Sequence, residues 1–301
     1  MADSSASENT KTILHATTEY SGSPKIIFDT DMGNDIDDAM ALAMIHSYQK
    51  LNKAELIAVT VSINSPWAAP FTDLVNTYYG NDAIPIGSVR EANTPVNDGY
   101  IRQLSEAKNE SGGQQYPHDL LSGDSGPSAV QVLRQTLAAQ PDQSVVFVTV
   151  GFSTNLSHLL QSEPDSYSQL TGKELVAQKV TLLSNMAGAF NARFREFNVI
   201  SDEPAARYMY ANWPTPIVSS GFEIGDAIIF PGAALDERIT YTDHHPIKDA
   251  FKIYNHQNRQ TWDLTSVIEA IEPGIYFKRS EPGKIVVDEG GNTIHSPSTN
   301  G

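Results

Sequence analysis

Five acidic side chains crowd together near the start of the chain, directly after a short apolar run at residues 26–28. They are Asp29, Asp31, Asp35, Asp37 and Asp38. Carboxylates this close repel one another, and two arrangements relieve the repulsion: a bound hard cation, or shared protons on groups whose pKa values are raised. Helix capping is a third use of such acids, but capping needs only one or two of them. The cluster therefore favours a metal site.

The flanking residues place this cluster at the edge of a predicted sheet. Residues 26–28 form a buried strand that stops at Asp29, and the alternating Ala and Met residues from Ala39 onward favour a helix. The acids therefore lie where a strand ends and a helix begins. In an open α/β sheet this carboxyl edge is where ligands bind.

Apolar runs predict five further strands that alternate with helices. The strands are expected over 54–63, 83–89, 144–150, 180–184 and 215–224, and helices over 71–79, over 128–139 and from 202 and 262 onward. Residues 274–295 read as a hairpin with its turn at Pro282-Gly283, and 90–127 as a long irregular loop. This order predicts an α/β fold: a single-domain, open, mostly parallel sheet flanked by helices, with a small C-terminal hairpin.

Composition narrows the classes of partner. The net charge of −16, from 20 basic and 36 acidic residues, argues against a nucleic-acid or anionic-membrane surface. No run approaches the ~20 apolar residues that span a membrane. Residues 1–23 are expected to be a polar, poorly ordered extension of a domain over 24–301, and they do not resemble a secretory signal. With no cysteine, the compartment stays open between cytoplasm and, after signal removal, periplasm or exterior.

Two known aspartate motifs fit the cluster poorly. Counted from Asp29, an EF-hand would need a ligand at Gly33 and a Glu at Met40, so an EF-hand is excluded. A phosphatase of the haloacid dehalogenase type would use Asp29 as the nucleophile and prefers Thr or Val where Gly33 stands. That alternative is weakened but stays open.

A third pattern matches far better. The run from Asp29 to Gly33, followed by Asp37-Asp38-Ala39-Met40-Ala41-Leu42, resembles the signature of the nucleoside hydrolases, with a slightly longer turn between its halves. Four later motifs resemble that family in the same order along residues 25–270. They are Asn64 at a strand end, the turn Gly151-Phe152-Ser153-Thr154-Asn155-Leu156, the run Glu196-Phe197-Asn198 before Asp202, and Thr261-Trp262-Asp263.

The resemblance implies a Rossmann-like fold and a Ca²⁺ site. The cation would be held by the carboxylates of Asp31, Asp38 and Asp263 and by the backbone carbonyl of Val150, together with a water and two ribose hydroxyls. Asp31 would be the general base that takes a proton from the attacking water. The ribose would be bound by Asp37, Asn64, Glu196 and Asn198, and, on a weaker match, by Asn191. On spacing alone, Asn64 is equally well explained as a turn residue.

The same resemblance implies a calcium-dependent hydrolase that cleaves the N-glycosidic bond of ribonucleosides into ribose and free base. Many relatives carry a His directly before the last aspartate, whereas this chain has Trp262, which purine-preferring relatives use to stack the base. This favours purine substrates, although Trp262 could also be ordinary packing. His256 is a candidate general acid. The alternatives are a riboside-binding protein with little turnover and the phosphatase. A homo-oligomer, dimer or tetramer, is expected.

Overall fold

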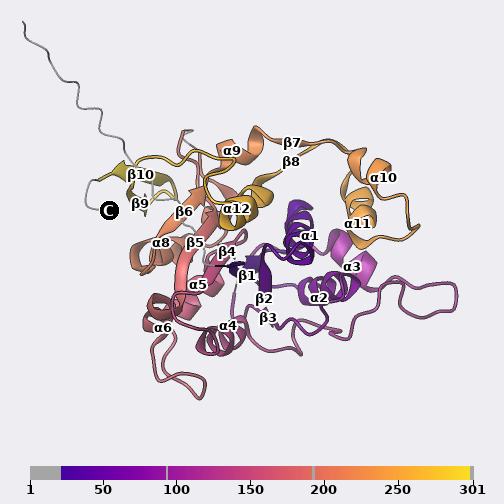
Figure 1. Ribbon diagram of the computed structural model, residues 1–301, viewed down its shortest axis with the longest axis horizontal. Helices are drawn as coiled ribbons and strands as arrows, with labels where there is room; N and C mark the ends of the chain where they lie inside the picture. Colours follow the sequence, from indigo (N-terminus) through magenta and orange to yellow (C-terminus); the bar gives the residue numbers. More distant parts are fainter. Residues whose placement is uncertain (1–21, 93, 192–193, 299–301) are drawn as a thin grey trace, which may run out of the picture.

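A six-stranded parallel sheet forms the centre of the computed structural model, which describes residues 22–92, 94–191 and 194–298 (Figure 1). Its strand order is β3-β2-β1-β4-β5-β6, and every neighbouring pair is parallel. The strands are β1 Lys25–Thr30, β2 Glu55–Val61, β3 Ile86–Ser88, β4 Val145–Thr149, β5 Val180–Met186 and β6 Ile217–Ser220. The predicted α/β class and open sheet are confirmed.

Helices cover both faces of the sheet because its central strands are apolar on both sides. In β1, Ile26 and Phe28 face one core, while Ile27 between them faces a second core. The helices are α1 Asp37–Lys50, α2 Ala68–Tyr78, α3 Gly99–Ser105, α4 Ala129–Ala138, α5 Thr154–Leu160, α6 Gly172–Lys179, α7 Phe197–Ser201, α8 Glu203–Asn212, α9 Phe222–Asp226, α10 Ala234–Arg238, α11 Pro246–Tyr254 and α12 Trp262–Ile271. No helix of the described residues is long and apolar enough to cross a membrane.

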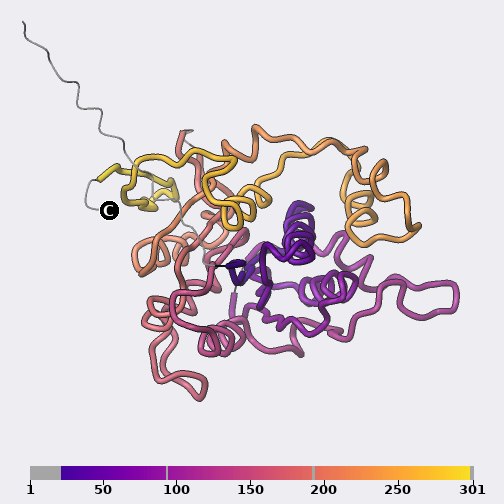
Figure 2. The backbone as a smooth tube through the Cα atoms, viewed as in Figure 1, coloured from indigo at the N-terminus to yellow at the C-terminus, as the bar shows by residue number. Residues whose placement is uncertain are grey.

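The strand order reverses its direction between β1 and β4. From β1 the chain runs outward through β2 and β3, and it then returns to β4 and runs outward the other way through β5 and β6. In Figure 2 the indigo start of the chain accordingly lies at the centre of the molecule, and the yellow hairpin lies at its periphery. Ligands bind at such a reversal, outside the carboxyl ends of the strands. Asp31 directly follows β1, and Val150 directly follows β4.

The two strand ends approach each other closely, and Gly151 permits this. A Cβ atom at Gly151 would lie 2.4 Å from the backbone nitrogen of Asp31 and 2.5 Å from the hydroxyl of Ser62. We therefore expect Gly151→Ala to lower the free energy of unfolding by roughly 3 kcal/mol, measured by urea denaturation. Gly22→Ala is the control, because nothing lies within 4 Å of a Cβ there. Equal stability of both variants would contradict the close approach.

Three predicted boundaries near the carboxyl edge were wrong. β1 runs through Asp29 to Thr30, because ladder pairing with β2 and β4 continues past the apolar run. The strand predicted over 215–224 ends at Ser220, and residues 222–226 form α9. The irregular segment 90–127 contains α3, whose buried Tyr100 and Ile101 pack into the core.

The C-terminal hairpin exists, but its register differs from the prediction. It pairs β9 Gly283–Val287 with β10 Thr293–Pro297, so the predicted first strand around 275–279 is not a strand and the turn is not at Pro282. The turn lies at 288–292 because Asp288 Oδ1 accepts hydrogen bonds from the backbone N–H groups of Gly290 and Asn292. A second antiparallel pair joins β7 Ile229–Phe230 to β8 Arg259–Gln260. The extension predicted over 1–23 lies outside the described residues except for Gly22 and Ser23, and the single-domain assignment stays a prediction.

Candidate active site

Asp29 is fully buried and fastens the strands beneath the site. Thr60 of β2 donates a hydrogen bond to its Oδ2 at 2.5 Å, Asn155 of α5 donates to the same atom at 2.7 Å, and Thr149 of β4 donates to Oδ1 at 3.2 Å. Burial raises the pKa of Asp29 to about 7, although the three donors oppose the shift. With three donors from neighbouring elements, Asp29 holds the strand ends together.

The other four acids of the cluster converge with a fifth from α12. One carboxylate oxygen each of Asp35, Asp37 and Asp263 lie within 4.8 Å of one another. Asp31 and Asp38 adjoin them, because, after burial, the negative charges of Asp35 and Asp37 raise the pKa of Asp31, and those of Asp31 and Asp37 raise the pKa of Asp38. Asp31 Oδ2 is buried without a hydrogen-bond partner, whereas Asp38 accepts a short hydrogen bond from Thr30. Of the three predicted carboxylate ligands, Asp263 belongs to the group within 4.8 Å, and the ligand roles of Asp31 and Asp38 stay predictions.

Burial and mutual repulsion raise the pKa values in this cluster. For Asp31 burial acts first and the negative charge of Asp35 second, and both raise the pKa well above its usual range. Asp38 and Asp263 are shifted in the same direction by burial, followed by the charges of Asp31 and Asp37 respectively. Such groups hold protons unless a positive charge favours their ionised forms.

Asp37, the first residue of α1, links the turn after β1 to the amino end of α12. We call this turn, residues 31–36, the aspartate turn. Its Oδ2 accepts hydrogen bonds from the backbone N–H groups of Trp262 at 2.9 Å and Asp263 at 3.3 Å. Thr261, at the helix N-cap position, makes no side-chain capping bond, so Asp37 supplies the cap from α1. This contact explains how an aspartate more than two hundred residues away reaches the cluster.

Arg259 of β8 also enters the cluster, and sequence reasoning missed it. Its Nη2 lies 2.5 Å from Asp35 Oδ2 and 3.4 Å from Asp37 Oδ1. The guanidinium carbon lies 4.9 Å from the ring centroid of Tyr254 and 5.2 Å from that of Trp262. The available signal was its place three residues before Trp262 in a chain whose buried acids need a counter-charge.

Val150 and Asn198 are brought together at the carboxyl edge. Asn198 Nδ2 donates to the backbone oxygen of Val150 at 2.7 Å and to that of Met186 at 3.1 Å. Glu196 lies beside them, but its carboxylate accepts backbone N–H groups at 2.9–3.1 Å from residues 188, 198 and 199 and so caps α7. Val150 and Asn198 therefore lie together at the end of β4, and Glu196 holds the loop that carries Asn198.

Asn64, Asn191 and His256 form hydrogen bonds with partners outside the carboxylate cluster. Asn64 follows β2 and donates to the backbone oxygen of Ala92 at 3.1 Å. The Asn191 backbone donates to Glu223 at 3.1 Å. His256 is exposed, and its Nε2 lies 2.7 Å from Asp236 Oδ2. The predicted roles of all three residues stay predictions.

Trp262 is partly exposed and packs against α9. Its indole stacks on Phe222 with ring centroids 5.3 Å apart and an interplanar angle of 30°, and its Nε1–H donates to the Phe222 backbone oxygen at 3.0 Å. These contacts fix the orientation of the ring directly beside the acids. Ordinary packing and base stacking are both compatible with this position.

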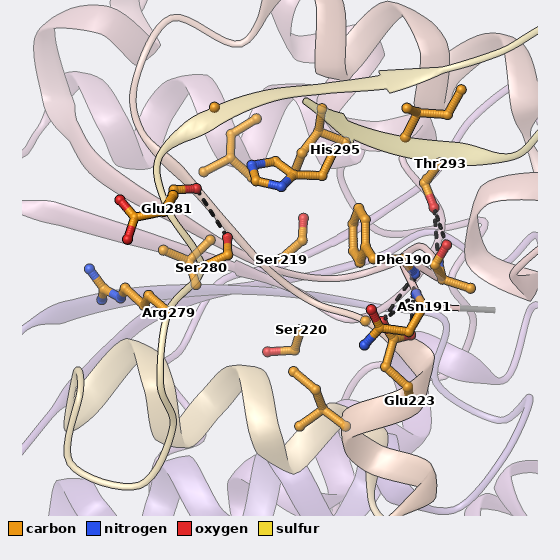
Figure 3. Close-up of a pocket in the computed structure, with 18 of the residues that line it drawn as sticks. Phe190, Asn191, Ser219, Ser220, Glu223, Arg279, Ser280, Glu281, Thr293 and His295 are labelled. Carbon is orange, nitrogen blue, oxygen red and sulfur yellow. Dashed lines mark hydrogen bonds between the residues drawn. The ribbon is translucent and has the colours of Figure 1, made fainter. Parts of the chain in front are cut away.

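A cavity of about 1120 Å³ lies elsewhere, between the free edge of β6 and the C-terminal hairpin. Figure 3 shows Asn191 and Glu223 at one side of this cavity and Arg279, Ser280 and Glu281 at the other. Thr293 of β10 fastens the hairpin to Ala189 through hydrogen bonds of 2.9 and 3.1 Å. None of the clustered aspartates lines the cavity.

The acidic cluster fits a hard divalent cation. It offers carboxylate oxygens alone, the donor type that Ca²⁺ and Mg²⁺ prefer. The buried, unpartnered oxygen of Asp31 and the raised pKa values show that the cluster lacks positive charge relative to its acids. A cation here would remove the repulsion and satisfy the unpartnered oxygen.

Comparison with known proteins gives one family. A family model described as inosine-uridine preferring nucleoside hydrolase matches residues 26–300. A search of curated proteins finds no match for the chain.

Solved structures share the fold at low identity. A plant nucleoside hydrolase is 20% identical with a TM-score of 0.66, over 91% of this chain and 87% of its own. A purine-preferring ribonucleoside hydrolase from Gardnerella vaginalis is 17% identical with a TM-score of 0.67, over 90% and 88%. An inosine-uridine preferring nucleoside hydrolase from Bacillus anthracis is 16% identical with a TM-score of 0.67, over 91% and 90%.

Proposed function

Because this chain belongs to the nucleoside hydrolase family, we propose that it hydrolyses purine ribonucleosides in a calcium-dependent reaction at the aspartate cluster. Hydrolysis of the N-glycosidic bond of nucleosides follows from the family. The choice of cation, the base preference and the residue roles are our proposal. The observation that carries it is the group of five carboxylates beyond the end of β1, four of them buried, with one oxygen of Asp31 unpartnered.

The residues that would hold the cation are Asp31, Asp38 and Asp263 with the backbone oxygen of Val150. Ca²⁺ takes six to eight oxygens, so protein atoms fill part of its shell and leave room for a water and two vicinal hydroxyls of a ribose. When bound, the ion supplies positive charge that acidifies the water and orients the sugar. Asn198, which contacts the Val150 oxygen, would reorient toward the sugar in the loaded site.

Asp31 would serve as the base in the hydrolysis. Water adds through its oxygen to C1′ while the bond from C1′ to the base nitrogen breaks, and Asp31 accepts one proton of that water. The base leaves with the bonding electron pair and takes a proton. Solvent would supply this proton, because His256 is exposed and held by Asp236.

Trp262 supports the purine preference. Its ring is fixed by Phe222 beside Asp263, where a departing base would lie against the indole face. Stacking on indole stabilises a large purine more than a small pyrimidine, because it buries more aromatic surface. The similar structures include both a purine-preferring and an inosine-uridine preferring hydrolase, so the fold does not decide the base.

The test is release of reducing sugar from inosine, guanosine, adenosine, uridine and cytidine by metal-free protein, with and without added Ca²⁺. We expect release from the three purine nucleosides only when Ca²⁺ is present. Release from pyrimidines alone would overturn the assignment of Trp262 as a stacking platform. Calcium-dependent binding of nucleosides without release of free base would instead support a riboside-binding protein of this fold.

The family match over residues 26–300 removes the phosphatase alternative. The expected dimer or tetramer stays a prediction, which light scattering of the purified protein would test.

A further inference from the structure

The aspartate turn and β8 contribute a matched pair of opposite charges to the site. Asp35 lies in the part of the turn that is longer than the signature pattern, between Gly33 and Asp37. Arg259 reaches it from β8, with Nη2 2.5 Å from Asp35 Oδ2. Among the described residues, Arg259 is the only Lys or Arg whose side chain is paired with an acid of the cluster.

Burial and contacts with two aromatic rings restrain the Arg259 side chain. Its side chain is 13% exposed, and the rings of Tyr254 and Trp262 contact its guanidinium. Its Nε is buried without a hydrogen-bond partner. Most ion pairs on protein surfaces contribute little to the free energy of unfolding. Placing a partly buried arginine against two aromatic rings costs desolvation free energy and side-chain entropy. The positive charge of Arg259 partly offsets the negative charges of Asp35 and Asp37.

The two acids that pair with Arg259 also belong to the group of three carboxylates whose oxygens lie within 4.8 Å of one another. Asp35 and Asp37, the two partners of Arg259, form that group together with Asp263. A divalent cation held by Asp31, Asp38 and Asp263 would lie beside the two acids that pair with the guanidinium, so the two positive charges would repel each other. Whichever is present favours ionised carboxylates and reduces the gain from the other.

We propose that Arg259 is an internal counter-cation that stabilises the ion-free site through Asp35 and Asp37 and, by electrostatic competition, weakens cation binding at the neighbouring Asp31, Asp38 and Asp263. The inference rests on the proposed function in taking the cation to be Ca²⁺. Arg259 would act through the two aspartates as a positioning residue. It allows a site with five carboxylates to fold before the ion binds and to release the ion again.

The competition predicts two effects of opposite sign for Arg259→Met, which keeps most of the apolar stem between the rings. Ca²⁺ should bind at least roughly tenfold more tightly, because a unit charge close to a divalent ion no longer repels it. The ion-free protein should at the same time melt at a lower temperature, because Asp35 and Asp37 lose their counter-charge. A purely structural arginine would weaken both properties together.

The experiment measures Ca²⁺ affinity by calorimetry and the melting temperature of metal-free protein by circular dichroism. Arg259→Lys retains the charge and should stay close to wild type in affinity. Arg279→Met is the matched control, because Arg279 also pairs with a buried acid, Glu269, at 2.7 Å but lies beside the hairpin cavity (Figure 3). It should lower the melting temperature and leave Ca²⁺ affinity unchanged.

A double variant keeps the test decisive if Arg259→Met alone fails to fold without the ion. Asp35→Asn with Arg259→Met removes both members of the pair and should restore the ion-free melting temperature toward wild type. Ca²⁺ affinity of Arg259→Met equal to or weaker than that of the wild type would overturn the inference while leaving the proposed function intact. Failure of the wild type to bind Ca²⁺ would overturn the calcium proposal itself, and this inference with it.

Discussion

Asp31→Asn is expected to lower kcat about 10³-fold, measured at saturating Ca²⁺ and nucleoside. The variant cannot accept the proton of the attacking water, although an amide oxygen can still face a cation. The same change should raise the melting temperature of the ion-free protein. Asp31 is buried, has an unpartnered oxygen and raises the pKa of Asp38, so an amide removes a source of repulsion from the cluster.

The opposite signs of the two effects separate a catalytic role from a structural one. Asp142→Asn serves as the control, since Asp142 is an exposed acid paired with Lys179 at the amino ends of β4 and β5, and both properties should stay near wild type. Binding of Ca²⁺ to Asp31→Asn is checked by calorimetry. Turnover near that of the wild type with Ca²⁺ still bound would remove Asp31 as the general base.

The ion-free protein is expected to lose stability as the pH rises from about 4 to about 7, and Ca²⁺ is expected to reduce this loss. Burial raises the pKa of Asp29 from 3.8 to about 7 in the folded state. Between these values the unfolded chain ionises Asp29 while the folded protein keeps it protonated. Unfolding is therefore increasingly favoured, by about 4 kcal/mol for this group alone at neutral pH.

This pH dependence of stability is opposite in sign to that of an acid in a salt bridge. A salt bridge lowers the pKa of the acid, so its contribution to stability is lost as the pH falls. The raised pKa values of Asp31, Asp38 and Asp263 act in the same direction as that of Asp29. A bound divalent cation favours the ionised carboxylates and lowers these pKa values, so it stabilises the folded protein most at neutral pH.

Melting temperatures of metal-free and Ca²⁺-loaded protein across this pH range provide the measurement. Asp29→Asn removes one titrating group and should flatten the decline of the metal-free protein. A melting temperature of metal-free protein that rises between about pH 4 and about pH 7 would contradict the raised pKa values.

Local patterns predicted most of the framework. The alternation of apolar runs and helix formers predicted the six strands of the parallel sheet, because the central strands are apolar on both faces. The predicted element boundaries were wrong where a tertiary contact or a side-chain hydrogen bond outweighed the local sequence pattern. The segment after Ser220 is apolar enough for a strand, yet it forms α9 and packs its Phe222 against Trp262. The hairpin register was decided by the side-chain chemistry of Asp288 and Asn292, which outweighed a Pro-Gly pair.

By itself the sequence predicted a cation site, because five aspartates follow an apolar run, and the resemblance to the nucleoside hydrolases added Asp263 after Trp262. Only the tertiary structure decided how these acids come together and which positive charge offsets them. Asp37 caps α12 and so brings Asp263 to the turn, and Arg259 places a positive charge against Asp35. Both contacts join segments more than two hundred residues apart. No local periodicity encodes such a pairing. The pairing depends on which strand ends and helix starts lie side by side once the helices have packed on the sheet.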